Sequence, residues 1–264
     1  MRIDVLLGES PTAPADVADR VVVVIDVLRA ATTVAVALSN GASVVCPFAS
    51  VDDTRRVAAS MIVPALTAGE REMVRIPGFD LGNSPAEYSR AVVEGRMILF
   101  TTTNGTAALI ATREARVSFL AAFVNVEATV TAVMETLLAE RGLAGVLLVC
   151  SGTDRQVTLE DVVCAGRLAR RLRETAGQTS MSLSLSDSAR VAVLAEAPYA
   201  HSLEALRRDA MHARSLEAAG FGGDVQRCFS VDTTPVAVRF GDGALRPIGR
   251  VAGFARDLRA ERVS

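Results

Sequence analysis

The chain has 264 residues, of which 50% are apolar and 22% are charged, and its formal net charge is −2 at pH 7. This composition excludes a disordered or fibrous chain, and the length is sufficient for one large domain or two modest ones. The small net charge gives no overall attraction to nucleic acid or to an anionic membrane surface. We therefore expect the partners to be small molecules or other subunits, including copies of the same chain.

The cysteines, the first residues and the apolar runs bear on where the protein acts. The four cysteines form no C-x-x-C pair, and the first residues lack the long apolar core of a signal peptide. Asp26 interrupts the longest apolar strand pattern well short of the roughly 18 residues needed to span a bilayer. The sequence thus predicts a cytoplasmic protein with reduced thiols. All 28 basic residues are arginine, which excludes a catalytic lysine.

Runs of β-branched residues alternate with helical patterns through the first two thirds of the chain. The sequence predicts strands at residues 2–7, 20–27, 43–47, 61–64, 97–101, 117–120 and 146–150. It predicts helices at residues 31–40, 85–93, 105–113, 127–141 and 159–175. Gly41 and Gly142 occupy positions typical of C-terminal caps. This alternation favours a three-layer α/β/α fold with a largely parallel sheet.

The last third of the chain has a different pattern. After Gly177 the sequence is serine-rich, and a long helical region over residues 188–219 precedes strand-like pieces at 229–231, 235–240 and 244–248. We place a weak boundary near residue 142, between subdomains 1–141 and 142–264. Because no low-complexity linker separates them, we expect these two α/β subdomains to pack closely.

The first polar motif follows the strand predicted at 20–27. Asp26 ends a run of five apolar residues, and an unpaired aspartate in a dry interior would cost several kcal/mol. Arg29 is its nearest candidate partner. One interpretation is a structural ion pair at a strand-to-helix turn. The other, which we favour, is a metal-binding or catalytic carboxylate beside a phosphate-binding guanidinium.

The second motif consists of two loops that carry charged residues. Ser84 and Pro85 predict a helix start, with Ser84 as the N-cap and Asn83 before it. Glu70 and Asp80, near Arg71, could hold a cation and an anion together. A capped surface helix after a glycine-rich turn explains the same residues about equally well.

The third motif follows the strand predicted at 97–101. Thr102, Thr103, Asn104 and Gly105 place hydroxyls, an amide and a glycine N–H at a predicted helix start. This arrangement is typical of a phosphate-binding turn, although no Walker lysine is present. The alternative is a plain N-cap, which needs only one of the threonines.

A fourth cluster follows the strand predicted at 146–150. Cys150 and Arg155 resemble the C-x5-R loop of the cysteine phosphatases, but the spacing is one residue short, which disfavours a thiolate nucleophile. Glu160 and Asp161 are better catalytic candidates. Because they open a predicted helix, stabilisation of the helix dipole is the alternative interpretation.

The candidate residues are rich in oxygen ligands. His201 and His212 lie in the helical C-terminal region without a nearby Ser or Cys motif, so we assign them surface or packing roles. Carboxylates without imidazole or paired thiols instead point to Mg²⁺, which typically uses one or two carboxylates, waters and the phosphate of the substrate. The candidate metal ligands are Asp26, Glu70 and Asp80.

Five motifs together resemble those of one enzyme family. D-V-L-R-A-A-T-T, G-E-R, G-F-D-L-G-N-S-P, T-T-N-G-T and L-E-D-V-V-C-A-G, in this order, are similar to motifs of the 2-phosphosulfolactate phosphatase (ComB) family. The resemblance runs from Arg20 to about Gly166, and residues 223–225 with Cys228 and Asp232 also fit. In that family, Mg²⁺-dependent hydrolysis of 2-phosphosulfolactate to sulfolactate and phosphate is a step of coenzyme M biosynthesis.

For this chain, the resemblance implies a phosphoric monoester hydrolase that acts on a small anionic substrate with Mg²⁺ as cofactor. The acidic candidates are Asp26, Glu70, Asp80, Glu160 and Asp161. The candidate anion-binding residues are Arg29, Arg71, Asn83, Ser84, Thr102, Thr103, Asn104 and Gly105. After G-E-R, where relatives commonly carry further glycines, this chain has the bulkier residues 72–75.

The sequence leaves the nucleophile and the substrate open. The nucleophile could be a Mg²⁺-bound water, Asp26 or Cys150, in that order of preference, with Arg29, Glu160 and Asp161 as the other catalytic candidates. Alternative functions are a phosphatase for another small hydroxy-acid phosphate and a non-catalytic module that binds a phosphorylated metabolite. Phosphate release that requires Mg²⁺ would distinguish an enzyme from a binding module.

Overall fold

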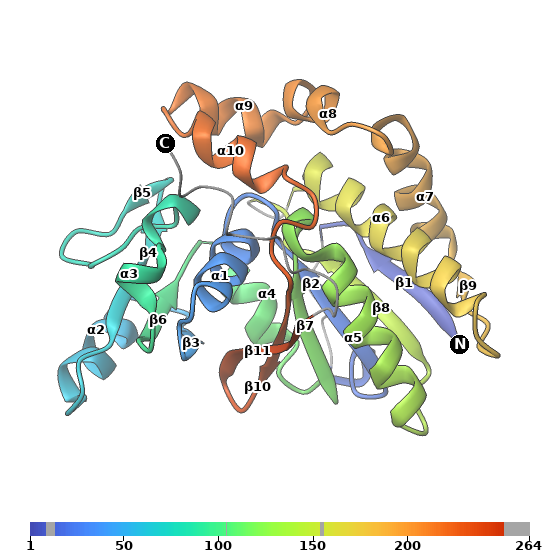
Figure 1. Ribbon diagram of the computed structural model, residues 1–264, viewed down its shortest axis with the longest axis horizontal. Helices are drawn as coiled ribbons and strands as arrows, with labels where there is room; N and C mark the ends of the chain where they lie inside the picture. The colour runs from blue at the N-terminus through green and yellow to red at the C-terminus, as the bar shows by residue number, and fades with distance from the viewer. Residues whose placement is uncertain (9–13, 104, 154–155, 251–264) are drawn as a thin grey trace, which may run out of the picture.

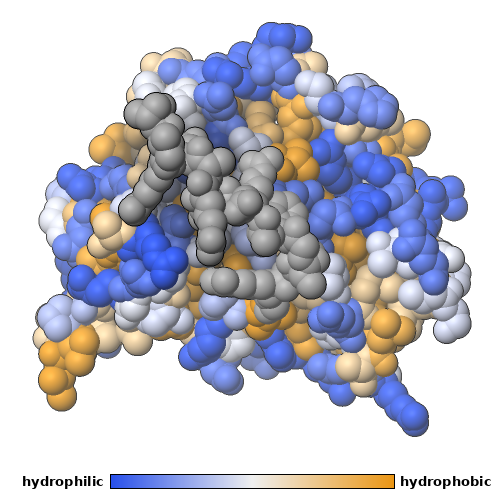
Figure 2. Space-filling model, viewed as in Figure 1, coloured by the Kyte–Doolittle hydropathy of each residue, from blue (hydrophilic) through white to orange (hydrophobic). Residues whose placement is uncertain are grey.

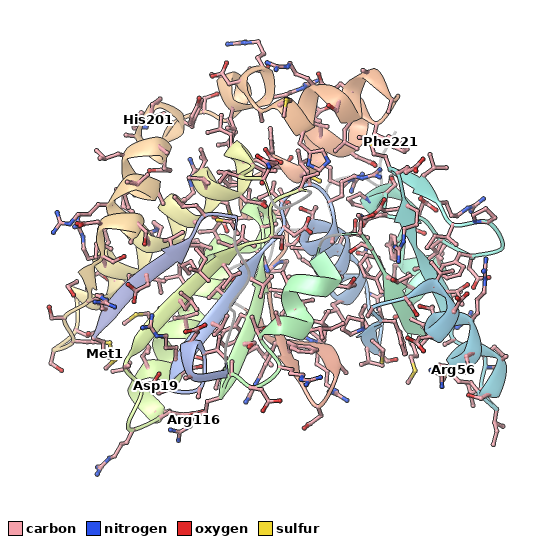
Figure 3. The ribbon with its side chains drawn as sticks, turned by 180° about the vertical axis from the view of Figure 1, so that it is seen from behind. Met1, Asp19, Arg56, Arg116, His201 and Phe221 are labelled. Carbon is pink, nitrogen blue, oxygen red and sulfur yellow. The ribbon has the colours of Figure 1, made fainter. Side chains whose placement is uncertain are left out.

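A computed structural model describes residues 1–8, 14–103, 105–153 and 156–250. Within these residues an eleven-stranded sheet carries helices on both faces (Figure 1). Helices α1 and α5 cover the face toward the viewer in Figure 1, whereas α4 lies on the opposite face, in front in Figure 3. The predicted three-layer α/β/α fold with a largely parallel sheet is confirmed.

The elements alternate along the chain much as the sequence pattern predicts. The strands are β1 (Arg2–Leu6), β2 (Arg20–Ile25), β3 (Val44–Pro47), β4 (Leu66–Arg71), β5 (Val74–Arg75), β6 (Met97–Thr101), β7 (Val117–Ala121), β8 (Gly145–Cys150), β9 (Ser184–Leu185), β10 (Val236–Gly241) and β11 (Ala244–Arg250). The α-helices are α1 (Ala30–Ser39), α2 (Val51–Ser60), α3 (Arg90–Val93), α4 (Gly105–Ala111), α5 (Val126–Ala139), α6 (Leu159–Ala176), α7 (Asp187–Glu196), α8 (Glu204–Asp209), α9 (Met211–Ala218) and α10 (Gly222–Cys228). Short 3₁₀ turns occur at η1 (Pro14–Asp16), η2 (Pro85–Glu87), η3 (Phe123–Asn125) and η4 (Ala197–Tyr199).

Two blocks of parallel strands flank an antiparallel hairpin. The strand order is β5-β4-β6-β3-β11-β10-β7-β2-β8-β1-β9. Strands β4, β6 and β3 form one parallel block, and β7, β2, β8, β1 and β9 form the other. The β10–β11 hairpin pairs antiparallel with β7 and β3. Because β8 pairs with both β1 and β2, strands from both sides of residue 142 share one block; the division expected there stays a prediction.

Three expected elements differ from the sequence pattern. The strand expected at 61–64 is an exposed bend, and strand β4 begins only after Pro64, which has no N–H to donate to a ladder. The helix expected at 85–93 is divided into η2 and α3. The region 188–219 is divided into α7, η4, α8 and α9, with Pro198 at the first break, where it cannot continue a helix.

Two further differences come from local capping. Helix α2 was not expected, and its N-cap Ser50 accepts a hydrogen bond from the Asp53 N–H. No strand forms at 229–231, because Phe229 is the C-cap of α10 and packs edge to face against Phe123. At α2 a capping hydrogen bond starts a helix that the hydrophobic periodicity did not predict. At 229–231 the end of α10 and an aromatic contact stand where the periodicity predicted a strand.

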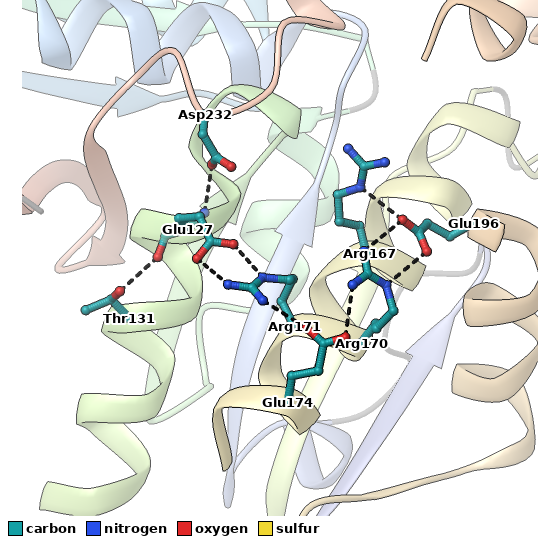
Figure 4. A network of polar contacts seen from close by, with 8 residues as sticks. All are labelled: Glu127, Thr131, Arg167, Arg170, Arg171, Glu174, Glu196 and Asp232. Carbon is teal, nitrogen blue, oxygen red and sulfur yellow. Dashed lines mark hydrogen bonds and ion pairs between the residues drawn. The ribbon is translucent and has the colours of Figure 1, made fainter. Parts of the chain in front are cut away.

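One buried and one partly exposed ion pair hold α6 in place between α7 and α5 (Figure 4). The Arg167 Nε lies 3.1 Å from Glu196 Oε1, and both side chains are almost completely buried. Arg171 makes two hydrogen bonds of 2.6 and 2.8 Å to Glu127 on α5. Removing one partner of a buried pair typically costs about 3–5 kcal/mol. The network therefore fixes the helix whose first residues, Glu160 and Asp161, belong to the site described below.

The surface is mostly polar, with few large apolar side chains exposed. An apolar tip lies at the lower left of Figure 2, the corner where α2 ends in Figure 1. Ile62 and Val63, which follow α2, are 99% and 75% exposed. Among the helices that the structure describes, none is both long and apolar enough to cross a membrane.

Candidate active site

A cavity of about 540 Å³ lies where loops from both strand blocks meet the C-terminal helices. Its walls come from the turn after β2, the β4–β5 hairpin, the loops after β6 and β8, and α9. The lining residues are Leu28, Arg29, Glu70, Arg71, Glu72, Met73, Asn83, Thr103, Thr153, His212 and Leu216. Five of the candidates predicted from the sequence are therefore brought together here: Arg29, Glu70, Arg71, Asn83 and Thr103.

Asp26 lies at the end of β2, inside the second strand block. It directly follows β2, is 6% exposed, and its Oδ1 accepts a 3.1 Å hydrogen bond from the Ala30 N–H at the start of α1. A Cβ atom at Gly105 would come within 2.5 Å of Asp26 Oδ2. Glycine at position 105 thus allows the first turn of α4 to lie directly against the carboxylate.

Arg29 does not pair with Asp26, the nearest partner in the sequence. Its Nη1 lies 2.8 Å from Oδ2 of Asp224 on α10, and its Nη2 donates to the Met73 carbonyl at 2.8 Å. The guanidinium also stacks on the Phe221 ring, 4.2 Å from the centroid. Arg29 therefore connects the turn after β2 to the start of α10. Asp224 compensates most of the positive charge of Arg29.

Arg71 is the arginine in the cavity whose charge is not compensated by a nearby acid. Its Nη1 donates to the Glu70 carbonyl at 2.7 Å and its Nη2 to Thr101 Oγ1 at 3.1 Å, and no carboxylate of the described residues pairs with it. Asn83 also lines the cavity, and its buried Oδ1 has no hydrogen-bond partner among the described residues. Arg71 is therefore available to an anionic ligand, whereas Asn83 Oδ1 can accept a hydrogen bond from a ligand or coordinate a cation.

Glu70 holds the loops of the cavity together. Its Oε1 accepts hydrogen bonds from the Thr103 N–H and hydroxyl at 3.0 and 3.1 Å, and its Oε2 accepts from the Met73 N–H at 3.0 Å. The hydroxyls of Thr102 and Thr106 each accept a hydrogen bond from the other's backbone N–H at 3.4 Å, which ties the end of β6 to the first turn of α4. The polar groups of both predicted phosphate-binding threonines are thus used within the protein, and Asn104 lies outside the described residues.

Two other candidates from the second motif do not line the cavity. The Ser84 hydroxyl donates to Asp224 Oδ1 at 2.6 Å, which fixes the partner of Arg29 instead of capping η2. Asp80 is exposed, and its Oδ2 accepts from the N–H and the hydroxyl of Thr67, both at 2.8 Å. Both side chains therefore form hydrogen bonds that stabilise loops near the cavity.

His212 lines the cavity, which corrects the surface or packing role expected for it. Its Nδ1 lies 3.3 Å from Glu160 Oε1 and 3.4 Å from Thr153 Oγ1. Glu160 is 1% exposed, and its Oε2 has no hydrogen-bond partner among the described residues. No local motif marks His212, because its partner Glu160 lies on a different helix, far away along the chain.

Asp161 and Cys150 are buried near the site and do not line the cavity. The Asp161 carboxylate accepts from the Val27 N–H at 2.9 Å and from the Gly152 N–H at 3.2 Å, which ties the ends of β2 and β8 together. Cys150 is 1% exposed and does not line the cavity, and burial raises the pKa of its thiol well above the ordinary value. A thiol that stays protonated argues against Cys150 as the nucleophile.

The buried acids shift one another's protonation. Burial raises the pKa of Asp26 from its ordinary value near 3.8 to about 6, and the charges of Glu70 and Glu160 add to this effect. Burial and the same kind of repulsion, from Glu160 and Asp26, raise the pKa of Asp161 well above its ordinary value. For His212 burial lowers the pKa, but the contact with Glu160 outweighs it and leaves the pKa above 6.5. The site therefore has excess negative charge that a cation would stabilise.

The acidic side chains of the site are the groups that could hold Mg²⁺. Among the described residues, no group of three or more His, Cys, Asp or Glu side chains is arranged to hold a metal ion. Mg²⁺, however, typically needs one or two protein carboxylates, with waters and substrate phosphate completing its shell. Asp26 and Glu160, which are buried and do not themselves line the cavity, could supply these carboxylates, since Glu160 Oε2 has no hydrogen-bond partner among the described residues. Asp80 is exposed and bonds to Thr67 instead.

Comparison with known proteins identifies relatives that share almost the whole chain. Residues 9–243 match the family described as 2-phosphosulpholactate phosphatase. A probable 2-phosphosulfolactate phosphatase of Thermotoga petrophila is 35% identical, covering 89% of this chain and 95% of the relative. Proteins of the same description are 37% identical in Symbiobacterium thermophilum, with 86% and 94% covered, and 29% identical in Clostridium beijerinckii, with 93% and 99% covered.

The raised pKa of Asp26 predicts a pH-dependent loss of stability. Since the folded protein holds the Asp26 proton up to about pH 6 and the unfolded chain releases it near 3.8, stability falls as pH rises through this window. In Asp26→Asn this loss is absent. The variant should therefore gain about 3 kcal/mol relative to the wild type between about pH 4 and about pH 7.

Urea denaturation without divalent cations at both pH values measures this gain. Asp52→Asn provides the control, because Asp52 is an exposed carboxylate in the first turn of α2 and undergoes the same chemical change. If Asp26→Asn and Asp52→Asn changed stability equally at the two pH values, the burial of the Asp26 charge would not be the cause.

Proposed function

Because the chain belongs to the 2-phosphosulfolactate phosphatase family, we propose that it hydrolyses the phosphomonoester of 2-phosphosulfolactate to sulfolactate and phosphate in a Mg²⁺-dependent reaction. The observation that carries the proposal is that Arg71, which forms no ion pair with a carboxylate of the described residues, lines the cavity, while the buried acid Glu160 contacts the lining residue His212 and the buried Asp26 begins the turn that carries Leu28 and Arg29. An uncompensated guanidinium attracts a phosphate, and the acids require a cation. Both requirements are met when a metal and a phosphate ester bind together.

Substrate binding is assigned to Arg71 and Asn83. The substrate carries phosphate, sulfonate and carboxylate groups, so the carboxylates of the site would repel it without compensation. Arg71 can donate to two oxygens of one anionic group, and the Asn83 amide can orient a polar group of the substrate. Because Asp224 already pairs with Arg29, the main role of Arg29 is to hold the segments around the cavity in position.

The carboxylates Asp26 and Glu160 would hold the metal. Asp26 belongs to the turn after β2 and Glu160 to the start of α6, and Asp161 fixes these two segments relative to each other through its hydrogen bonds. When bound, Mg²⁺ neutralises negative charge on the phosphate and promotes attack by water. With Cys150 buried, water is the preferred nucleophile.

His212 is assigned to protonate the leaving oxygen. Glu160 contacts its Nδ1, so Nε2 is the nitrogen left to face a ligand in the cavity. The contact with Glu160 also raises the pKa of the ring above its ordinary value, which favours the protonated form. An alkoxide is a poor leaving group, and a positioned acid typically contributes a factor of about 10²–10⁴ to the rate of such a step.

Phosphate release tests the proposed activity. We expect the purified protein to release phosphate from 2-phosphosulfolactate with added Mg²⁺ and to lose this activity in EDTA. A panel that contains 2-phospholactate, which lacks the sulfonate, measures the specificity through kcat/KM. Higher kcat/KM for 2-phospholactate would assign the protein to another hydroxy-acid phosphate, and binding of these esters without phosphate release would indicate a non-catalytic module.

Arg71→Gln tests the phosphate-binding role. Removing one stabilising group from the transition state typically costs about a hundredfold or more, so kcat/KM should fall at least about 10²-fold. Arg75→Gln is the matched control, because Arg75 is exposed on the neighbouring strand β5 and lies outside the cavity. Steady-state kinetics would contradict the assignment if the two variants lost the same activity.

His212→Gln tests the leaving-group acid. We expect kcat for 2-phosphosulfolactate to fall by about 10²-fold or more, while hydrolysis of an aryl phosphate such as p-nitrophenyl phosphate changes far less, because its phenolate leaves without a proton. His201→Gln, which changes the exposed histidine, should match the wild type. An equal loss with both substrates would indicate a structural role for His212.

A further inference from the structure

A second cavity, of about 820 Å³, lies at the other end of the molecule and shares no lining residue with the first. It is formed by the segment between α4 and β7, the start of β7, and the β10–β11 hairpin. The hairpin turn lies at the bottom of Figure 1, whereas α9 with His212 lies at the top. In Figure 3, Arg116 from this cavity is at the lower edge and Phe221, which stacks on Arg29, is near the top.

The lining of this cavity is strongly basic. Among its lining residues, four are arginines and one, Asp242, is acidic; the arginines are Arg113, Arg116, Arg239 and Arg246. The first two have acidic partners outside the cavity lining, since Arg113 pairs with Glu114 and Arg116 with Glu140. Neither Arg239 nor Arg246 pairs with a carboxylate of the described residues. The protein's overall charge of −2 thus hides a local excess of positive charge.

Arg239 and Arg246 stand directly opposite each other in the hairpin. The antiparallel register pairs Arg239 on β10 with Arg246 on β11, so both side chains project from the same face of the ribbon. Like charges directly opposite in a sheet are destabilising. On its other side Arg239 is opposite Phe119, which is fully buried and carries no charge. The strand neighbours of the pair therefore do not relieve its repulsion.

The remaining walls of the cavity are suited to an organic ligand. Ile110, Phe240 and Ile248 provide apolar surface beside the arginines, and the volume is within the range of about 300–1,000 Å³ typical of small-molecule sites. Two adjacent guanidiniums can each bind a phosphate or carboxylate group through paired hydrogen bonds. An anion between them would replace repulsion by attraction.

We propose that this cavity binds a small organic polyanion, a molecule with two or more phosphate groups attached to an apolar body, held by Arg239 and Arg246. Arg113 and Arg116 at the rim strengthen the attraction, and Ile110, Phe240 and Ile248 contact the apolar body. This site is independent of phosphate-ester hydrolysis, because none of its residues belongs to the first cavity.

Calorimetric titration with ATP and with inorganic tripolyphosphate, in EDTA and at fixed ionic strength, tests the proposal. We expect the wild type to bind both probes, and ATP more tightly because it has the organic body. Arg239→Gln and Arg246→Gln should each weaken ATP binding at least about tenfold. Arg190→Gln, which removes an exposed arginine on α7, and Arg71→Gln in the first cavity should leave it unchanged.

Other results would overturn the proposal. Absence of ATP binding to the wild type, or weakening by Arg71→Gln alone, would show that this cavity is not a polyanion site. Equal weakening by Arg190→Gln would show a general charge effect, and equal affinity for both probes would exclude a role for the organic body. The Arg239→Gln variant should unfold at the same or higher urea concentration than the wild type, which distinguishes lost binding from misfolding.

Discussion

The burial of three carboxylates at the ends of the central strands is the constraint on which the candidate active site depends. Asp26, Glu160 and Asp161 are each at most 6% exposed, and burying charges at such short range is costly unless hydrogen bonds or a cation compensate. Asp161 obtains its compensation from the backbone N–H groups at the ends of β2 and β8. Asp26 accepts a hydrogen bond from the Ala30 N–H, and Glu160 Oε2 has no partner among the described residues, which is why we propose that a cation binds beside them.

A second set of contacts encloses the cavity from the side of the C-terminal helices. Asp224 on α10 accepts from both Arg29 and Ser84, so one carboxylate connects the turn after β2, the start of η2 and the last helices. The neighbouring helix α9 carries His212 into the cavity. The C-terminal third therefore supplies one wall of the site as well as the proton donor that we assign.

The β4–β5 hairpin shows how this chain accommodates bulky residues at a tight turn. Glu72 and Met73 have φ angles of 52° and 68°, in the left-handed region that glycine adopts most easily and that a tight two-residue hairpin turn requires. The strained turn is held by hydrogen bonds from the Met73 N–H to Glu70 and from Arg29 to the Met73 carbonyl. Because both bonds involve residues of the cavity, the same contacts that retain the turn also position Glu70 and Arg29.

The sequence by itself determined the alternation of strands and helices, the family, and the strand end that carries Asp26, since these follow from local periodicity and short motifs, whereas the strand β4 that ends in Glu70 and Arg71 was not predicted. It did not determine the exposed bend at 61–64 or the division of 85–93 and 188–219, where prolines and caps override the pattern. Only the tertiary structure paired Arg29 with Asp224, turned Asp80 and Ser84 away from the cavity, and placed His212 against Glu160. The physical reason is that a charged side chain takes its partner from whatever packs against it, and those segments lie far apart along the chain.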